Sequence, residues 1–124
     1  MEGVLIRRAG AADGLLVAAL TIQAAREEGL VPPVGFLDHY ADAWLAQREA
    51  YPTWWAEAER QHVGLLVAHR IRPLPWPDEP GAGALRPVRL FARPDYAVDV
   101  ITSALRAAAR EWAAAHGIVT FDLD

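Results

Sequence analysis

The chain has 124 residues, of which 53% are hydrophobic and 23% charged, with a formal net charge of −4. This length suits one domain spanning residues 1–124, and the apolar content excludes a disordered chain. Cysteine is absent, which excludes disulfides and thiol chemistry and fits a reducing cytoplasm. All 12 cationic side chains are arginine, so a lysine Schiff base is excluded as well.

The charge and hydropathy patterns narrow the classes of partner. A net negative charge argues against nucleic acid, because binding to phosphates needs a clustered excess of cations. No apolar run approaches the roughly 20 residues that span a bilayer, so no membrane segment is predicted. The four histidines are scattered without ligand spacing, so no metal site is predicted.

The first half of the chain predicts a strand followed by two helices. The strand covers Gly3–Arg8, and a helix over Ala12–Glu28 ends at Gly29, a residue suited to the left-handed cap position. A second helix is predicted over Gly35–Ala50 and ends before Pro52. The core-facing residues predicted on these two helices are Leu16, Leu20, Ala24, Phe36, Leu37, Tyr40 and Trp44.

From Thr53 the hydrophobic period changes to that of strands. Glu59–His62 reads as a hairpin turn, and adjacent Trp54 and Trp55 are predicted to point to opposite faces of one strand. The long helix presents Ile101, Leu105, Ala108 and Trp112 to the core. The predicted elements are strands Thr53–Ala58, Val63–Arg72, Val88–Ala92 and Ile118–Leu123, and a helix over Asp95–His116.

Proline and glycine exclude regular structure between residues 73 and 81. The segment Pro73–Pro80, with Trp76, could be a polyproline ligand for an aromatic-lined domain. An ordered loop between two strands, with Trp76 against the body of the domain, is the favoured interpretation.

The resulting order is β-α-α-β-β-β-α-β, an α/β (α+β) arrangement with a mixed sheet flanked by helices. Three stretches occur in it at fitting positions: Ile6-Arg7-Arg8-Ala9, then Thr53–Ala58 with the Val63-Gly64 that follows its hairpin, and Leu90–Tyr96. Together they resemble the GNAT (GCN5-related N-acetyltransferase) family over essentially the whole chain.

The resemblance implies where acetyl-CoA would bind. Family members place an arginine or glutamine and several glycines at the start of the long helix, where backbone N–H groups surround the pyrophosphate. Here Ala97 replaces the cation, while Val98, Val100 and Thr102 replace glycines; these β-branched residues disfavour positive φ. The family positions for the cofactor are Leu90, Phe91, Ala92, Ala97, Val98, Val100 and Thr102.

Asp99 adds a carboxylate to the same helix start. A carboxylate there satisfies the helix dipole itself and repels a pyrophosphate by about 1 kcal/mol per charge pair at 4 Å in water. Tight acetyl-CoA binding in the usual mode is therefore not expected.

Family members usually continue past the fifth strand into another helix, which often supplies a tyrosine acid, and two more strands. The chain ends at Asp124, so the resemblance implies a fold without them and an uncovered apolar edge at Ile118–Leu123. Because proteins rarely leave such an edge open, we expect a homodimer or a partner chain there.

Acetyl transfer to an amine needs a base. Glu57 is the first candidate, although a solvent-facing strand carboxylate is the favoured interpretation. His69 could be a base, and an ordinary half-buried histidine is again favoured; His62 is placed in a turn and His116 near a helix end.

Three functional hypotheses follow. The first is a GNAT-fold protein with an eroded acetyl-CoA site that is non-catalytic or weakly active and works as an oligomer or partner-binding subunit. The second is an active N-acetyltransferase that moves an acetyl group from acetyl-CoA to a small-molecule or N-terminal amine. The third is a small-ligand sensor that uses the cleft between the fourth and fifth strands.

Overall fold

A five-stranded sheet forms the centre of the structure, a computed structural model that describes residues 3–75, 77, 83–118 and 120–121. The strands follow one another in chain order, with β1 to β4 antiparallel and β5 parallel to β4. Their bounds are β1 Leu5–Arg8, β2 Thr53–Ala58, β3 Gln61–Ile71, β4 Ala84–Ala92 and β5 Thr120–Phe121.

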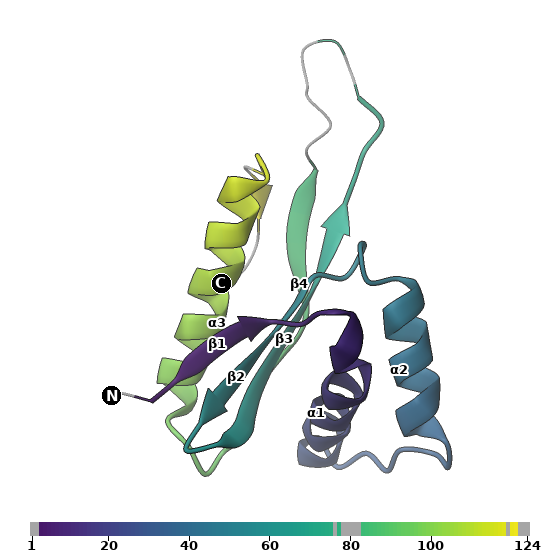
Figure 1. Ribbon diagram of the computed structural model, residues 1–124, viewed down its shortest axis with the longest axis vertical. Coiled ribbons are helices and arrows are strands. Elements are labelled where there is room, and N and C mark those ends of the chain that lie inside the picture. The colour runs from purple at the N-terminus through teal and green to yellow at the C-terminus, as the bar shows by residue number, and fades with distance from the viewer. Residues whose placement is uncertain (1–2, 76, 78–82, 119, 122–124) are drawn as a thin grey trace.

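Helices cover both faces of the sheet (Figure 1). Helices α1 (Gly14–Glu27), which follows the short 3-10 turn η1 (Ala11–Asp13), and α2 (Phe36–Ala46) lie on one face. Helix α3 (Val98–Ala115) lies on the other and connects β4 to β5. The predicted element order and the mixed α+β arrangement are confirmed.

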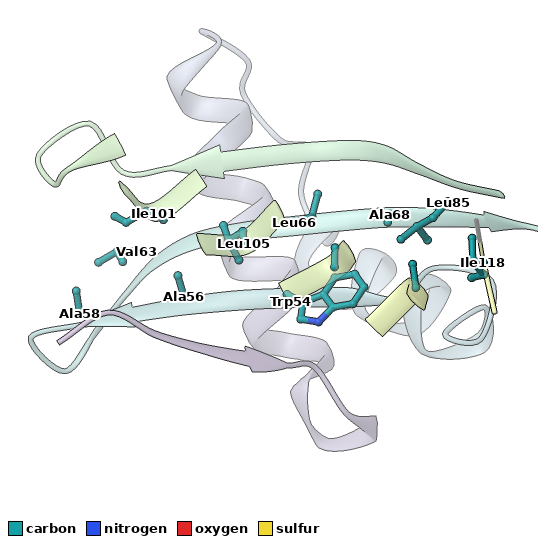
Figure 2. Packing of buried hydrophobic residues seen from close by; sticks show 12 residues of the cluster. Trp54, Ala56, Ala58, Val63, Leu66, Ala68, Leu85, Ile101, Leu105 and Ile118 are labelled. Carbon is teal, nitrogen blue, oxygen red and sulfur yellow. The ribbon is translucent and has the colours of Figure 1, made fainter. Parts of the chain in front are cut away.

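Each face of the sheet has its own core. Trp54, 3% exposed, packs on the α3 side, and Trp55, 8% exposed, packs on the side of α1 and α2. The prediction that the two tryptophans point to opposite faces is therefore confirmed. Figure 2 shows the α3-side core, in which Ile101 and Leu105 meet Leu66 and Ala56 of the sheet.

The contact between α3 and the sheet depends on Gly64 in β3. A Cβ atom at this position would lie 2.6 Å from Cγ2 of Ile101 and 3.2 Å from Cδ1 of Leu105. No real Cβ contact is that short, so any side chain here would push α3 away from β3. The glycine of the Val63-Gly64 pair is thus required by packing.

The β2–β3 hairpin is tighter than predicted. Only Glu59 and Arg60 form the turn, with φ of 52° and 64°, the signs required at both central positions of a type I′ turn. His62 was wrongly placed in the turn; it lies in β3 opposite Glu57, with its ring edge-on to Trp55.

Strand β4 begins at Ala84, four residues before the predicted start at Val88. Pro87 concealed this start, because a proline in a strand normally argues against a ladder. The ladder accommodates it beside a bulge: Val67 pairs with Arg89 while Ala68 pairs with Pro87, which leaves Val88 as an extra residue on β4.

The remaining predicted bounds differ at the element ends. The predicted strand at Gly3 begins at Leu5, the helix predicted to Ala50 ends at Ala46, and the long helix begins at Val98. Leu37 was wrongly assigned to the core face, since it is 39% exposed. On α3 the buried residues are Ile101, Leu105, Ala109 and Ala113, with Ala108 and Trp112 half-buried beside them.

Two predictions fall largely outside the described residues. In the Pro73–Pro80 segment, Trp76 and residues 78–80 are not described, so neither interpretation of this loop is tested. Of the Ile118–Leu123 edge, Ile118 is buried and Thr120–Phe121 pairs with β4, while residues 119 and 122–123 are not described. Among the described residues, no helix is both long and apolar enough to cross a membrane.

Replacing Gly64 with alanine should destabilise the fold by about 1–3 kcal/mol, because the new methyl group overpacks the contact with Ile101. Urea unfolding measures this loss. Gly14→Ala is the matched control, since a Cβ there meets its nearest neighbour at an ordinary 3.6 Å and helical backbone favours alanine. A Gly64→Ala protein as stable as the Gly14→Ala protein would contradict the packing argument.

Candidate functional site

Among the described residues, the parallel strands β4 and β5 pair through Ala84 and Leu85, at the beginning of β4. Within the described residues, the rest of the β5-facing edge of β4 has no strand partner. The backbone N–H of Arg93 donates to the carbonyl of Val63 in β3. Successive backbone N–H groups along a strand point to opposite edges of that strand. The N–H groups of Ala92 and Leu90 therefore point to the open edge.

The side chains of the three predicted strand positions belong to the cores. Phe91 is 8% exposed and packs on the side of α1 and α2, whereas Leu90 and Ala92 pack against the α3-side cluster. Only their backbone is left for a ligand at the open edge. These residues can hold a cofactor through peptide groups alone.

The start of α3 is an ordinary helix N-terminus. Ala97 precedes it with φ −76° and ψ 85°, and Ile101 donates the first helical hydrogen bond to the carbonyl of Ala97. The N–H groups of Val98, Asp99 and Val100 precede this bond and have no partner within the helix. No residue from 97 to 102 has positive φ, so this helix start lacks the left-handed backbone that glycines permit, and its β-branched residues are not strained.

Side chains rather than backbone distinguish this helix start. Val98 and Val100 are 39% and 43% exposed, and Asp99 is an exposed carboxylate in the first turn. The hydroxyl of Thr102 donates to the carbonyl of Val98 at 2.9 Å. Two β-branched side chains and a negative charge therefore surround the free N–H groups.

Arg93 is the cation nearest in sequence to this helix start, and it is already paired. Its Nη2 and Nε donate to the two carboxylate oxygens of Asp95 at 2.7 and 3.1 Å, and its guanidinium carbon lies 5.3 Å from the Tyr96 ring centroid. These two hydrogen bonds lower the pKa of Asp95 and raise the pKa of Arg93. The turn before α3 thus carries no unmatched positive charge.

A pocket of about 420 Å³ opens on the other face of the sheet, between α1, α2 and β4. Its wall is mostly apolar and includes the aromatic pair Phe36 and Tyr40, whose ring centroids lie 5.8 Å apart. A smaller cavity of about 210 Å³ shares Tyr40 and Val88 with it. The hydrophobic residues predicted on α2 therefore line a cavity as well as a core.

The bulge in β4 shapes this pocket. Val88 and Arg89 are consecutive, yet both line it, which a regular strand would not allow. Arg89 Nη1 donates to Glu28 Oε2 at 3.3 Å, and Glu28 lines the pocket as well. Sequence analysis missed Glu28, because nothing in the local pattern at the end of this helix indicates a partner on a distant strand.

The predicted bases do not meet in this pocket. Glu57 does not line the pocket; it lies opposite His62 in β3. His62 is five positions before Val67, the strand partner of Arg89 in the pocket wall, and five strand residues span roughly 16 Å. His69 stacks on Tyr51, with ring centroids 4.8 Å apart, beside the smaller cavity.

His116 stacks on Trp112 with centroids 4.2 Å apart, at the far end of α3. Among the described residues, no group of three histidine or acidic side chains could hold a metal ion.

Comparisons with known proteins identify the fold. No protein-family model and no curated protein matches the chain. Solved structures do match, including a predicted acetyltransferase from Clostridium acetobutylicum with acetyl-CoA. It is 14% identical with a TM-score of 0.77, over 96% of this chain and 79% of that one.

Two further structures agree. A ribosomal-protein-alanine N-acetyltransferase from Brucella melitensis is 20% identical, with a TM-score of 0.72, over 95% of this chain and 77% of that one. A GCN5-related N-acetyltransferase from Ralstonia eutropha is 22% identical, with a TM-score of 0.71, over 97% and 82%. The chain therefore has the GNAT fold, as its sequence predicts.

The Arg93–Asp95 pair gives a prediction on pH. Arg93→Gln should raise the pKa of Asp95 towards its ordinary value, which carboxyl carbon NMR can follow through an acid titration. Because the pair lowers the pKa of Asp95, its contribution to stability is present above the unfolded pKa and is lost as the pH falls through the folded pKa. Arg60→Gln is the control; a pKa unchanged by Arg93→Gln would contradict the pairing.

Proposed function

We propose that this chain is a GNAT-fold protein that does not hold acetyl-CoA in the usual way, and that it acts as a non-catalytic or weakly active binding protein. The start of α3 carries this proposal. Ala97, Val98, Val100 and Thr102 stand at the positions where the family resemblance implies a cation and glycines, and Asp99 lies among them.

The charges at the helix start support the proposal. A pyrophosphate there would meet Asp99 and Asp95, while Arg93 is committed to Asp95 by two hydrogen bonds. Each carboxylate–phosphate charge pair costs about 1 kcal/mol at 4 Å even at the dielectric of water. Three free N–H groups and the helix dipole attract an anion, but Asp99 already complements that dipole.

The side chains oppose close approach as well. Glycine in a phosphate-binding turn allows the backbone N–H groups to touch the phosphate oxygens. The exposed Val98 and Val100 add bulk beside those N–H groups, and Thr102 directs its hydroxyl back to the helix. A ligand therefore has neither the charge nor the access that this anchor needs.

A second candidate function, acetyl transfer to a small amine, is favoured by one observation. The pocket of about 420 Å³ lies beside the β4 bulge, on the face of α1 and α2, and contains one carboxylate, Glu28. That carboxylate could receive a proton from an amine, although Arg89 already neutralises it. Titration with acetyl-CoA decides between the two candidates.

We expect no detectable heat when acetyl-CoA is titrated into the purified protein, and no change in melting temperature at millimolar ligand. The physical reason is the repulsion and bulk at Asp99, Val98 and Val100. Micromolar binding by the wild-type protein would refute the proposal and support acetyl transfer.

A variant with a restored loop provides the positive control for this titration. The changes Ala97→Arg, Val98→Gly, Asp99→Asn and Val100→Gly together should create measurable binding, because they supply a cation and access to the N–H groups. Asp42→Asn on the exposed side of α2 removes one charge elsewhere and should create none. Equal binding by both variants would show that the loop is not the cause.

Association through β5 is the second part of the proposal. Among the described residues β5 is the last strand of the sheet, so one of its edges has no strand partner there. We expect a homodimer, or capture of a partner chain, at the Ile118–Leu123 edge. Light scattering should give twice the mass of the chain at high concentration, and a strictly monomeric protein would count against homodimerisation.

A further inference from the structure

Two arginines converge on one tryptophan near the C-terminal end of α3. Arg8 ends β1 and Arg70 lies near the end of β3; their guanidinium carbons lie 4.9 and 5.6 Å from the centroid of the Trp112 ring. The imidazole of His116 stacks on the same indole at 4.2 Å. These four residues are here called the Trp112 cluster.

The sheet register places both arginines on the α3 face. Arg8 lies opposite Trp54, which belongs to the α3-side core and makes an edge contact of 5.7 Å with Trp112. Arg70 is two residues beyond Ala68, another residue of that core, so it shares the same face. The cluster therefore lies at the rim of the α3-side core.

Carboxylates in the described part of the chain do not balance the positive charge of this cluster. Burial lowers the pKa of Arg8, and the nearby Arg48 lowers it further; burial and Arg72 do the same for Arg70. Within the described part of the chain, Arg8 and Arg70 form no ion pair with a carboxylate, whereas Arg89 and Arg93 each have one.

Buried hydrogen-bond donors in the cluster also lack partners. Nε of Arg70 and Nε1 of Trp112 are buried and have no acceptor among the described residues. Both groups can only donate, and a buried donor without an acceptor is costly. Within the described residues the cluster is therefore short of acceptor atoms and of negative charge, and an anion supplies both.

Capping of the helix end does not explain the arginines. The backbone N–H groups of His116, Gly117 and Ile118 already donate to the carbonyls of Trp112, Ala114 and Ala113. Nδ1 of His116 lies 2.8 Å from the carbonyl of Trp112, which can only accept, so this nitrogen donates. The last turn is thus satisfied by its own neighbours.

We propose that the Trp112 cluster binds the phosphoryl group of a small phosphorylated ligand. The planar donor fork of arginine matches phosphate oxygens, and two guanidinium groups suit a dianion better than a single carboxylate. The site lies at the opposite end of α3 from Ala97–Thr102, so it does not depend on the proposed loss of acetyl-CoA binding.

The test follows the indole N–H signal of Trp112, assigned with Trp112→Phe, by NMR. Inorganic phosphate and inorganic pyrophosphate are the probes, and sodium acetate at matched ionic strength is the comparison. We expect a saturable shift with phosphate or pyrophosphate and none with acetate. No saturable shift with either phosphate probe, or an equal shift with acetate, would overturn the proposal.

Variants establish which residues bind. Arg8→Gln and Arg70→Gln should each weaken the affinity by about tenfold or more, because each loses charge-assisted hydrogen bonds. Arg60→Gln, in the β2–β3 turn, removes the same charge elsewhere and should leave the affinity unchanged. Equal weakening by all three would show non-specific attraction and overturn the site.

Two further measurements distinguish a loss of binding from a loss of folding, and a small ligand from a lipid. Arg70→Lys keeps the charge without the fork, so it should bind more tightly than Arg70→Gln at a similar melting temperature; equal affinities would overturn the role of Arg70. The protein should stay in the supernatant with vesicles of phosphatidylcholine and phosphatidic acid. If the wild-type protein pellets with the vesicles and the Arg8→Gln protein does not, the phosphoryl group belongs to a lipid and the small-ligand proposal is wrong.

Discussion

The close approach of α3 to β3 at Gly64 is the contact on which the rest of the molecule depends. Because Gly64 has no side chain, Ile101 and Leu105 reach the middle of the sheet and complete the core shared with Leu66 and Ala56. This contact positions α3 against the sheet. It therefore also fixes the position of the free N–H groups at one end of the helix and of Trp112 at the other.

The two ends of α3 have opposite electrostatic character. At its start, where a helix normally attracts anions, Asp99 and the paired Arg93 leave no excess positive charge. Near its end, where the dipole favours cations, Arg8 and Arg70 gather around Trp112 without carboxylate partners in the described residues. The fold alone would suggest a ligand at the first end, while the side chains favour the second; fold does not determine function.

The bulge in β4 determines which of its side chains line the pocket on the face of α1 and α2. The bulge at Val88 directs two consecutive side chains, Val88 and Arg89, into the pocket and brings Arg89 to Glu28. The same irregularity accommodates Pro87, which concealed the start of β4 in the sequence. A feature that weakens the local strand signal thus shapes the pocket, as is common where β-bulges occur near functional sites.

The sequence by itself determined the order of the elements, the opposite faces of Trp54 and Trp55, and the unusual side chains at the start of α3, because these depend on local periodicity and on residue type. It did not determine which distant residues meet. The pairing of Glu28 with Arg89, the separation of Glu57 from the pocket, and the convergence of Arg8 and Arg70 on Trp112 depend on strand register and helix packing. These contacts join residues up to about a hundred positions apart, and only tertiary structure places such residues within a few ångströms of each other.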